Sequence, residues 1–544
     1  MGFGWWWGMV GALLSFHGFC YSQQDPNYTF VRHATTSPEL SYYDYIIIGG
    51  GTAGCPLAAT LSQNYNVLLI ERGGSPYGNQ NITNLSAFGA TLADISPTSA
   101  AQRFISEDGV INSRARVLGG GSCLNAGFYT RASPDYVNAV GWDGNLVNQS
   151  YQWVEKIVAF EPPMLQWQSA VRGGLLEVGV LPYNGFTYDH MSGTKVGGTI
   201  FDHDGNPRPV AYGVIFVDEK GMMHRAYLQE GSKNEIILSA GALGSPQLLM
   251  LSGVGPAKHL RSHNITVVSD NPMVGQGMSD NPMNAIYVPS PNDVEISLIQ
   301  VVGITQNGSY IEAASGGNFA RPSSQGFQGN FGINFGMFSP QTGQLSTVPP
   351  KQRTPEAIEA AIKAMNSLDS RAFRGGFLLE KIMGPLSTGH LELRNQNPNE
   401  NPSVTFNYFK EPEDLQKCIA GLTTIENVID SKAFSSFRYP NYSLQDLINM
   451  TMNFPVNLRP KHDNDTTSLE QFCRDTVMTI WHYHGGCHVD QVVDHDYKVL
   501  GVDALRVLDG STFNYSPGTN PQATVMMLGR YMGVQILNDR LQSN

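Results

Sequence analysis

The sequence predicts an α/β fold, and two observations near the N-terminus lead to this prediction. A run rich in β-branched residues, Tyr43–Ile48, has the composition of a buried parallel strand and leads directly into the glycine-rich segment Gly49–Gly54. Small and apolar residues suited to a packed helix, Cys55–Leu61, are followed by a second apolar strand, Val67–Ile70, which ends at Glu71. Strand, glycine turn, helix, strand and acid in this order are the fingerprint of a Rossmann-like, dinucleotide-binding fold.

The residue types in this unit each have a physical role. Glycines allow the tight turn and let a pyrophosphate approach the N–H groups at the start of the helix. Glu71 can accept hydrogen bonds from both hydroxyls of a ribose, and its charge disfavours a ligand that carries a 2′-phosphate. The predicted contacts to the dinucleotide are Gly49, Gly51, Thr52, Ala53, Gly54, Glu71 and Arg72.

Length and composition indicate a large globular enzyme. A chain of 544 residues is long enough for two domains, and its 58 glycines, 31 prolines and 41% apolar residues are typical of a loop-rich globular protein. The net charge of −12, without any basic cluster, argues against a nucleic-acid partner, because phosphates require a basic face. No group of Cys and His residues has the spacing of metal ligands, so no metal site is predicted.

The N-terminal segment predicts entry into the secretory pathway. Residues 1–22 contain an apolar run, Phe3–Phe19, followed by small and polar residues, which is typical of a signal peptide cleaved near Ser22. A short membrane anchor is the alternative, although the run is near the lower length limit for spanning a bilayer, and no later segment is apolar enough to span one. In an oxidising compartment, Cys418 and Cys473 could form a disulfide.

Secretion to the cell exterior or cell wall would agree with the glycosylation signals. N-x-S/T triplets begin at Asn27, Asn81, Asn84, Asn148, Asn264, Asn307, Asn441, Asn449, Asn464 and Asn514.

Further glycine-rich segments suggest which dinucleotide is bound. Arg116–Gly127 is a loop whose N–H groups could face a phosphate or the edge of a flavin. A strand at Glu235–Ser239 leads into the glycine turn and apolar helix of Gly241–Pro256. The C-terminal part contains Trp481–Cys487, Asp509–Ser511 and Gly518–Gln522. In their order and spacing these segments resemble the glucose–methanol–choline (GMC) oxidoreductases, which bind FAD, over nearly the whole chain after the N-terminal segment.

The resemblance is greatest to one branch of that family. Trp481–Cys487 and Gly518–Gly533 look most like the plant HOTHEAD-type branch, and the plant mandelonitrile lyases are the next most similar. The resemblance implies a Rossmann-like FAD-binding domain interwoven with a substrate-binding domain that carries an antiparallel sheet and helices. The FAD-binding domain would comprise residues 43–132, 197–287 and 481–544, and the substrate-binding domain residues 133–196 and 288–480.

The resemblance also implies the residues that contact FAD. They are Val117, Gly121, Asn125, Ala126, Gly127, Phe128, Trp481, His482, Asp509, Gly510, Asn520, Pro521 and Gln522. Cys418 and Cys473 match the paired cysteines of the lyase branch.

Two of these residues are the expected catalytic groups. His482 matches the catalytic histidine of the family, and a neutral imidazole is suited to remove the hydroxyl proton while hydride leaves the alcohol carbon. Asn520 matches the second active-site position and could hold the substrate oxygen, although it cannot titrate. Pro521 is placed to open a helix from Gln522 to about Leu537, whose positive end would stabilise a reduced flavin. For His484 we expect structural hydrogen bonding.

One region departs from the family pattern. After Gly197–Asp202, relatives typically continue with a helix and a strand, whereas here only residues 203–212 precede the hairpin strand at Gly213–Asp218. Roughly thirty residues, about one helix-plus-strand unit, are missing. Either this is a natural adaptation or the transcript or gene model is truncated, and the loss of a buried strand would expose a sheet edge.

The predicted function is FAD-dependent oxidation of an alcohol by hydride transfer to flavin N5, with His482 as general base. The resemblance implies a long-chain ω-hydroxy fatty acid or a related alcohol as substrate, and it leaves the electron acceptor and the oligomeric state open. One alternative is a hydroxynitrile (mandelonitrile) lyase with structural FAD, which favours a second charged imidazole where this chain has Asn520. The other is an inactive or truncated secreted flavoprotein.

Overall fold

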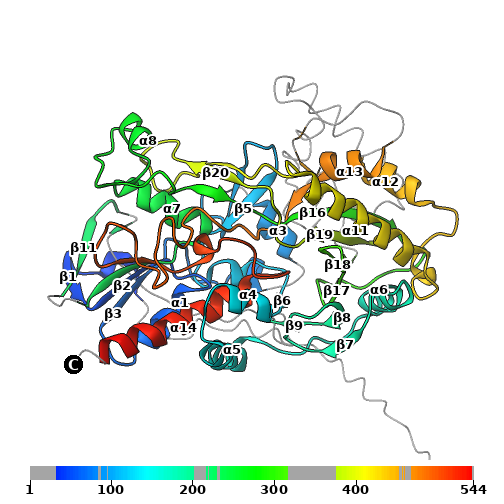
Figure 1. The fold of residues 1–544 in the computed structure, drawn as a ribbon, viewed down its shortest axis with the longest axis horizontal. Coiled ribbons are helices and arrows are strands. Elements are labelled where there is room, and N and C mark those ends of the chain that lie inside the picture. The colour runs from blue at the N-terminus through cyan, green and yellow to red at the C-terminus, as the bar shows by residue number, and fades with distance from the viewer. Residues whose placement is uncertain are drawn as a thin grey trace, which may run out of the picture.

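The computed structural model describes residues 32–83, 87–94, 96–200, 216–218, 220–229, 233–316, 375–452, 456–457, 459 and 467–541. The predicted signal segment 1–22 and the shortened stretch 203–212 lie outside these residues. Within them, no helix is long and apolar enough to cross a membrane. Figure 1 shows one sheet beside the C-terminal helix and a second, larger sheet beside another group of helices.

The predicted βαβ unit is confirmed. β2 (Tyr45–Ile48) lies inside a parallel sheet with the strand order β23-β12-β2-β3, and α1 (Gly54–Leu61) connects it to its neighbour β3 (Val67–Ile70). β12 (Glu235–Leu238) and β23 (Leu505–Val507) complete the sheet on the other side of β2. Segments that are far apart in the sequence therefore end at one edge of the sheet, where the predicted FAD motifs begin.

The predicted strand Tyr43–Ile48 is divided at Asp44. The residues before Asp44 form β1 (Leu40–Tyr43), which pairs in parallel with β11 (Met223–Leu228) in a separate sheet. The backbone N–H of Asp44 donates to the Asn66 carbonyl oxygen at 2.9 Å, and the Asn66 N–H donates to Asp44 Oδ2 at 2.9 Å. This pair of hydrogen bonds fixes the point at which the chain passes from one sheet to the other.

The C-terminal helix α14 (Gln522–Leu541) packs against α1. The contact is close because α14 has a glycine at the crossing: a Cβ atom on Gly529 would lie 2.2 Å from the carbonyl oxygen of Ala53. A side chain at this position would push the helices apart. The packing therefore places Gly529 of α14 beside Ala53, in the glycine turn that precedes α1.

The second large sheet has seven strands in the order β22-β16-β19-β18-β17-β8-β7, antiparallel except for the pair β7 and β8. Its strands are β7 (Tyr183–Phe186), β8 (Gly193–Val196), β16 (Pro282–Pro289), β17 (Val301–Ile304), β18 (Ser309–Ser315), β19 (Gly375–Ile382) and β22 (Met478–Thr479). Every residue of β16, β18 and β19 is buried. The helices packed against the sheet are α6 (Gln166–Glu177), α11 (Pro412–Asp430), α12 (Leu444–Met452) and α13 (Leu469–Thr476).

Smaller elements connect these two bodies of structure. The other strands are β4 (Ala101–Ile105), β5 (Ile111–Ala115), β6 (Phe128–Tyr129), β9 (Gly198–Thr199), β10 (Phe216–Val217), β13 (Val254–Gly255), β14 (Ser269–Asp270), β15 (Gln276–Met278), β20 (Gly389–Glu392) and β21 (Ser403–Thr405). The other α-helices are α2 (Gln80–Thr83), α3 (Phe88–Ala93), α4 (Pro134–Ala139), α5 (Gly144–Val158), α7 (Gly241–Leu251) and α8 (Ala257–Ser262). The mixed α/β architecture agrees with the predicted fold class.

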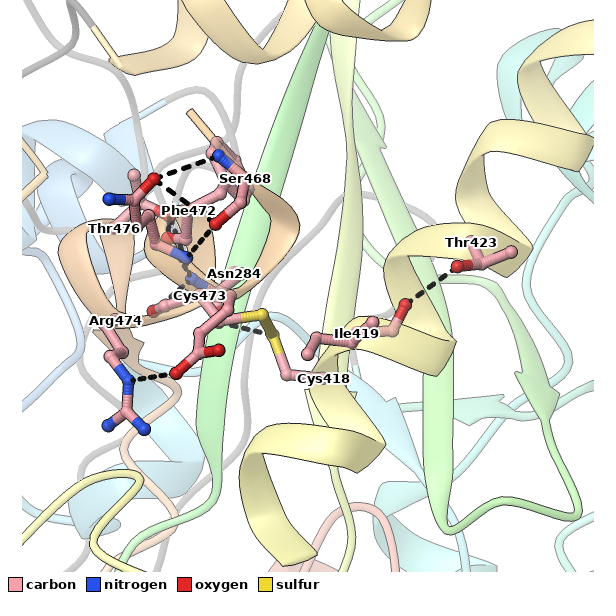
Figure 2. Close-up of a disulfide and its surroundings, with 11 residues drawn as sticks. Asn284, Cys418, Ile419, Thr423, Ser468, Phe472, Cys473, Arg474 and Thr476 are labelled. Carbon is pink, nitrogen blue, oxygen red and sulfur yellow. Dashed lines mark hydrogen bonds and ion pairs between the residues drawn. A yellow bond between two sulfur atoms is a disulfide. The ribbon is translucent and has the colours of Figure 1, made fainter. Parts of the chain in front are cut away.

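Cys418 of α11 and Cys473 of α13 form the predicted disulfide, which Figure 2 shows between the two helices. Both residues are fully buried. The side-chain amide of Asn284, on β16, donates to the Cys473 carbonyl oxygen at 2.9 Å, and α13 begins with a capping box formed by Ser468 and Gln471. The disulfide thus fixes α13 against α11 shortly before the chain enters β22 and the motif that contains His482.

Candidate active site

The glycine turn after β2 is packed too tightly for a side chain at two of its predicted positions. A Cβ on Gly49, whose φ is +108°, would lie 2.3 Å from the Ser239 carbonyl oxygen, and a Cβ on Gly54 would lie 2.0 Å from the Gly49 carbonyl oxygen. At Gly51, by contrast, the nearest such atom is 3.8 Å away. The turn therefore combines close helix–strand packing with a backbone that a pyrophosphate can approach.

Glu71 is held at the end of β3 by backbone donors. The Gly50 N–H donates to Oε2 at 3.1 Å, and the Gly73 N–H donates to Oε1 at 2.8 Å. Burial raises the pKa of the Glu71 carboxyl, and these hydrogen bonds act in the opposite direction. Each carboxylate oxygen keeps a second lone pair, so Glu71 can still accept hydrogen bonds from ribose hydroxyls. The side chain of Arg72 is exposed beside it.

The glycine-rich loop after β5 lies against this turn. The Gly119 N–H donates to the Gly50 carbonyl oxygen at 2.7 Å, and the hydroxyl groups of Thr52 and Ser122 are hydrogen-bonded at 2.9 Å. A Cβ on Gly121 would meet no atom within 4 Å, so the loop borders open space. Two motifs about 70 residues apart thus form two walls of one backbone-lined cradle, and this arrangement fits FAD.

Hydrogen bonds also join this loop to the start of α14. The Asn125 amide donates to Gln522 Oε1 at 2.6 Å, and the Gln522 amide donates to the Phe128 carbonyl oxygen at 2.5 Å. The Gly127 N–H donates to Asn125 Oδ1 at 2.6 Å. Pro521 directly precedes α14, as predicted. The positive end of a 20-residue helix therefore begins at the cradle, where it favours negative charge.

Two other predicted contacts lie in the packed walls of the cradle. Val117 is fully buried. The Asp509 carboxylate accepts hydrogen bonds from the Gly241 N–H at 2.9 Å and the Ser245 hydroxyl at 2.6 Å, so it caps the start of α7. This leaves the backbone of Asp509 and Gly510, rather than the carboxylate, as the part that could face FAD.

His482 is held by its backbone and by neighbours of its ring. Its N–H donates to Asp280 Oδ1 at 2.9 Å, and its Nδ1 lies 3.4 Å from the amide nitrogen of Asn281. Burial and the charge of Lys381 lower the pKa of His482 well below its usual 6.5, although the Thr519 backbone acts in the opposite direction. The imidazole is therefore neutral at physiological pH, as a general base must be.

Asn520, next to Thr519 in the chain, is only 8% exposed. Its Oδ1 has no hydrogen-bond partner among the described residues. Burial raises the pKa of the Glu312 carboxyl, whereas an ion pair with Lys381 and the Asn520 amide both lower it. A buried amide oxygen without a partner is costly unless a ligand supplies one, so Asn520 is suited to receive a hydroxyl group.

Apolar side chains pack around Trp481, the residue before His482. Trp481 packs against a cluster formed by Phe88 and Leu92 of α3, together with Ala126 and Leu298. Trp481 has a φ of +60°, a conformation that is uncommon for a bulky residue and that recurs at active sites. The site therefore offers a polar end at His482 and Asn520 and an apolar wall next to it.

Sequence reasoning did not identify Asp280, Asn281, Glu312 and Lys381. A signal was available for the last two, because each places a charge within a run of buried strand residues, where an unpaired charge would be costly. His484 was expected to be structural, and a ring nitrogen lies 3.0 Å from the His482 carbonyl oxygen.

Comparison with known proteins assigns the family. Two family models, both described as GMC oxidoreductase, match residues 187–283 and 385–529. The chain is 51% identical to the protein HOTHEAD of Arabidopsis thaliana, over 94% of this chain and 93% of that protein. It is 43% identical to an (R)-mandelonitrile lyase-like protein of Arabidopsis thaliana, again over 94% and 93%. It is 39% identical to sinalpyl alcohol oxidase Nec3 of Nesocodon mauritianus, over 92% of this chain and 90% of that protein.

The similarity to HOTHEAD extends over 559 aligned positions but takes in only 94% of a chain of 544 residues. HOTHEAD therefore contains residues that have no counterpart here.

Solved structures share the fold. A formate oxidase of Aspergillus oryzae superimposes with a TM-score of 0.68 at 17% identity, covering 93% of this chain and all of that one. Pyridoxine 4-oxidase from Mesorbium loti superimposes with a TM-score of 0.64 at 18% identity, covering 90% of this chain and 98% of that one. On its similarity to relatives along nearly the whole sequence, and on the FAD motifs assembled above, the chain belongs to the GMC oxidoreductase family and is an FAD-dependent oxidoreductase.

Proposed function

We propose that this enzyme oxidises the hydroxyl group of an apolar alcohol and that long-chain ω-hydroxy fatty acids are its substrate class. The observation that carries the proposal is a partly buried, neutral His482 close in the fold to Asn520, whose amide oxygen has no partner among the described residues. FAD, when bound, supplies the N5 atom that accepts a hydride from the alcohol carbon.

The side chains divide the work at the substrate hydroxyl. His482 accepts the hydroxyl proton on a ring nitrogen, which its low pKa leaves unprotonated. Asn520 orients the hydroxyl through its amide and exchanges no proton, because an amide does not titrate at physiological pH. The start of α14 adds a positive dipole end at the cradle, which favours negative charge there.

The substrate class is inferred from the apolar wall. The partly buried side chains of Trp481, Leu298 and Ala126 can bury further apolar surface against an alkyl chain, whereas a small polar alcohol would leave that surface uncovered. HOTHEAD is the relative with 51% identity, and Nec3 is named for the oxidation of an alcohol. The resemblance to Nec3 supports oxidation of a hydroxyl group by this chain.

The test is anaerobic reduction of the FAD-loaded protein by ω-hydroxy fatty acids. The rate of reduction is measured from the bleaching of the flavin absorbance. His482→Ala should slow reduction by roughly 10²–10⁴-fold, the usual contribution of a general base. His495→Ala is the matched control, because His495 is exposed and pairs with Asp490 on the surface. Equal rates for the His482 variant and the wild type would refute the proposed role.

Measurements on the same purified protein distinguish two alternative functions from alcohol oxidation. A hydroxynitrile lyase is favoured by the 43% identity to a lyase-like relative, but it would have to work without a second imidazole because Asn520 occupies that position. Cyanide release from mandelonitrile without flavin reduction by alcohols would establish that alternative. An inactive flavoprotein would be purified without a flavin spectrum, or with one that no alcohol bleaches.

We further propose that the protein is secreted. A fully buried disulfide between Cys418 and Cys473 is stable in an oxidising compartment. The sequon residues Asn148 and Asn441 are exposed and therefore accessible for glycosylation. A mobility shift on treatment of the plant-expressed protein with an N-glycosidase would support secretion, and intracellular retention without glycans would contradict it.

A further inference from the structure

The carboxyl group of Asp280 lies directly behind the catalytic histidine. Asp280 is only 2% exposed and sits between β15 and β16. Its Oδ2 accepts hydrogen bonds from the Tyr408 hydroxyl and the Thr479 hydroxyl, both at 2.6 Å, and its Oδ1 accepts the N–H of His482 at 2.9 Å. Within the described part of the chain, Asp280 forms no ion pair. Three donors from two segments of the chain, Tyr408 from one and Thr479 with His482 from the other, therefore converge on one buried carboxyl group.

This carboxyl group holds both ends of a strained turn. Trp481 has a positive φ, and its N–H donates to the Thr479 hydroxyl oxygen at 2.7 Å. The same hydroxyl donates to Asp280, which also holds the N–H of His482 on the other side of Trp481. A non-glycine residue in this conformation costs about 1–3 kcal/mol and persists only where its surroundings enforce it. Asp280 provides that enforcement.

We propose that Asp280 is a positioning residue which fixes the backbone of His482, and that ionisation of Asp280, rather than of the His482 imidazole, sets the pH dependence of alcohol oxidation near neutrality. This inference rests on the proposed function, since it concerns the rate of the step that His482 assists.

The groups that face Asp280 support this assignment. Burial raises the pKa of Asp280 to about 7, and the hydrogen bonds from Thr479, Tyr408 and the backbone only partly offset burial. The phenols that interact with it, those of Tyr310, Tyr408 and Tyr483, have pKa values raised well above 10 by burial. The pKa of His482 is lowered, well below 6.5. Asp280 is therefore the group of this set that changes charge near neutral pH.

Protonation of Asp280 would loosen the turn. An ionised carboxylate accepts all three hydrogen bonds and strengthens each of them, because one partner is charged. A protonated carboxyl has one oxygen that donates, so a neighbouring hydroxyl must reverse and the hold on the His482 N–H weakens. Because the folded state must ionise Asp280 to hold His482 firmly, the rate should rise with pH through about 7.

The test compares three variants of the FAD-loaded enzyme with the wild type over the pH range on both sides of neutrality. Asp280→Asn keeps the acceptor for the His482 N–H but cannot ionise. It should reduce flavin at a pH-independent rate, equal to the low rate that the wild type reaches in acid. Tyr408→Phe removes a hydrogen bond that lowers the pKa of Asp280, so its rate profile should move to higher pH by about one unit.

The matched control is Tyr497→Phe. The Tyr497 hydroxyl is also buried in one hydrogen bond, which it accepts from the Trp142 indole at 2.9 Å, but it does not contact Asp280. Its pH profile should coincide with that of the wild type. A wild-type profile in both Asp280→Asn and Tyr408→Phe would overturn the inference. If Asp280→Asn fails to fold, the shift in Tyr408→Phe decides.

A second readout does not depend on turnover. The NMR signal of the His482 ring can be observed in protein labelled with ¹⁵N-histidine and is assigned by its loss in His482→Gln. Its chemical shift should change with a midpoint near neutral pH and should remain that of a neutral imidazole throughout. In Asp280→Asn this change should disappear. If the wild type oxidises no alcohol, the proposed function fails and this signal still decides the role of Asp280. A His482 signal that becomes that of an imidazolium near neutral pH, or that is unchanged by Asp280→Asn, overturns the inference alone.

Discussion

Removing the buried disulfide gives a prediction whose size follows from the structure. Cys418 and Cys473 are 55 residues apart in sequence, so the bond closes a loop of that length in the unfolded chain. The loss of chain entropy in such a loop is worth about 4 kcal/mol at 25 °C. This is a large part of the ~5–15 kcal/mol by which proteins of ordinary stability are folded. The double variant Cys418→Ala and Cys473→Ala should lose at least that amount.

The assay is urea unfolding of the FAD-loaded wild type and the double variant, with helix content measured by far-UV circular dichroism. The control is wild-type protein whose disulfide has been reduced with a thiol. This reduced protein should unfold at about the same urea concentration as the double variant. The disulfide joins α11 to α13 near β22, so the variant should also lose flavin-reduction activity at lower urea concentrations than it loses helix content. A double variant within about 1 kcal/mol of the wild type would refute the loop-closure argument.

Three further predictions concern the cradle and the buried ion pair. Gly54→Ala places a Cβ 2.0 Å from the Gly49 carbonyl oxygen, so the purified protein should contain little FAD, measured by flavin absorbance per chain; normal loading would contradict this packing. Glu71→Gln should weaken FAD binding at least tenfold in a fluorescence titration, because a hydrogen bond to a charged group is worth about 1.5–3 kcal/mol; unchanged affinity would exclude a ribose contact. Lys381→Met leaves Glu312 buried without its counter-charge, so stability should fall by about 3–5 kcal/mol above neutral pH. This loss of stability should shrink as the pH falls and Glu312 is protonated. Equal losses in chemical denaturation above neutral pH and in acid would contradict this account.

The parts of the fold that sequence alone predicted are those with local signals. Gly49–Gly54 and Glu71 are bounded by short apolar strands, so strand, turn and helix can be read along the chain. The start of a helix after Pro521 is a further local signal that the structure confirms, whereas the pairing of Cys418 with Cys473, also confirmed, was implied by the family resemblance. The same helix runs to Leu541, about one turn beyond its predicted end, because its apolar pattern weakens before its backbone hydrogen bonds end.

The parts that sequence did not predict depend on contacts across the fold. Glu312 and Lys381 meet only because β18 and β19 pair in a particular register, and the intervening residues give no local sign of that register. Asp280 gains its role from Tyr408 and Thr479, which come from segments more than a hundred residues away. Such convergence is a property of the tertiary structure, and periodicity cannot show it.

The most direct test of the account is single-turnover reduction of the native FAD-loaded enzyme by an ω-hydroxy fatty acid under anaerobic conditions. We expect the flavin absorbance to bleach, and we expect deuterium on the hydroxyl-bearing carbon to slow that bleaching, because a hydride leaves this carbon. The His482→Ala variant should keep its FAD and bleach roughly 10²–10⁴-fold more slowly. A protein that holds FAD but is bleached by no alcohol, or a His482→Ala variant that bleaches at the wild-type rate, would contradict the account.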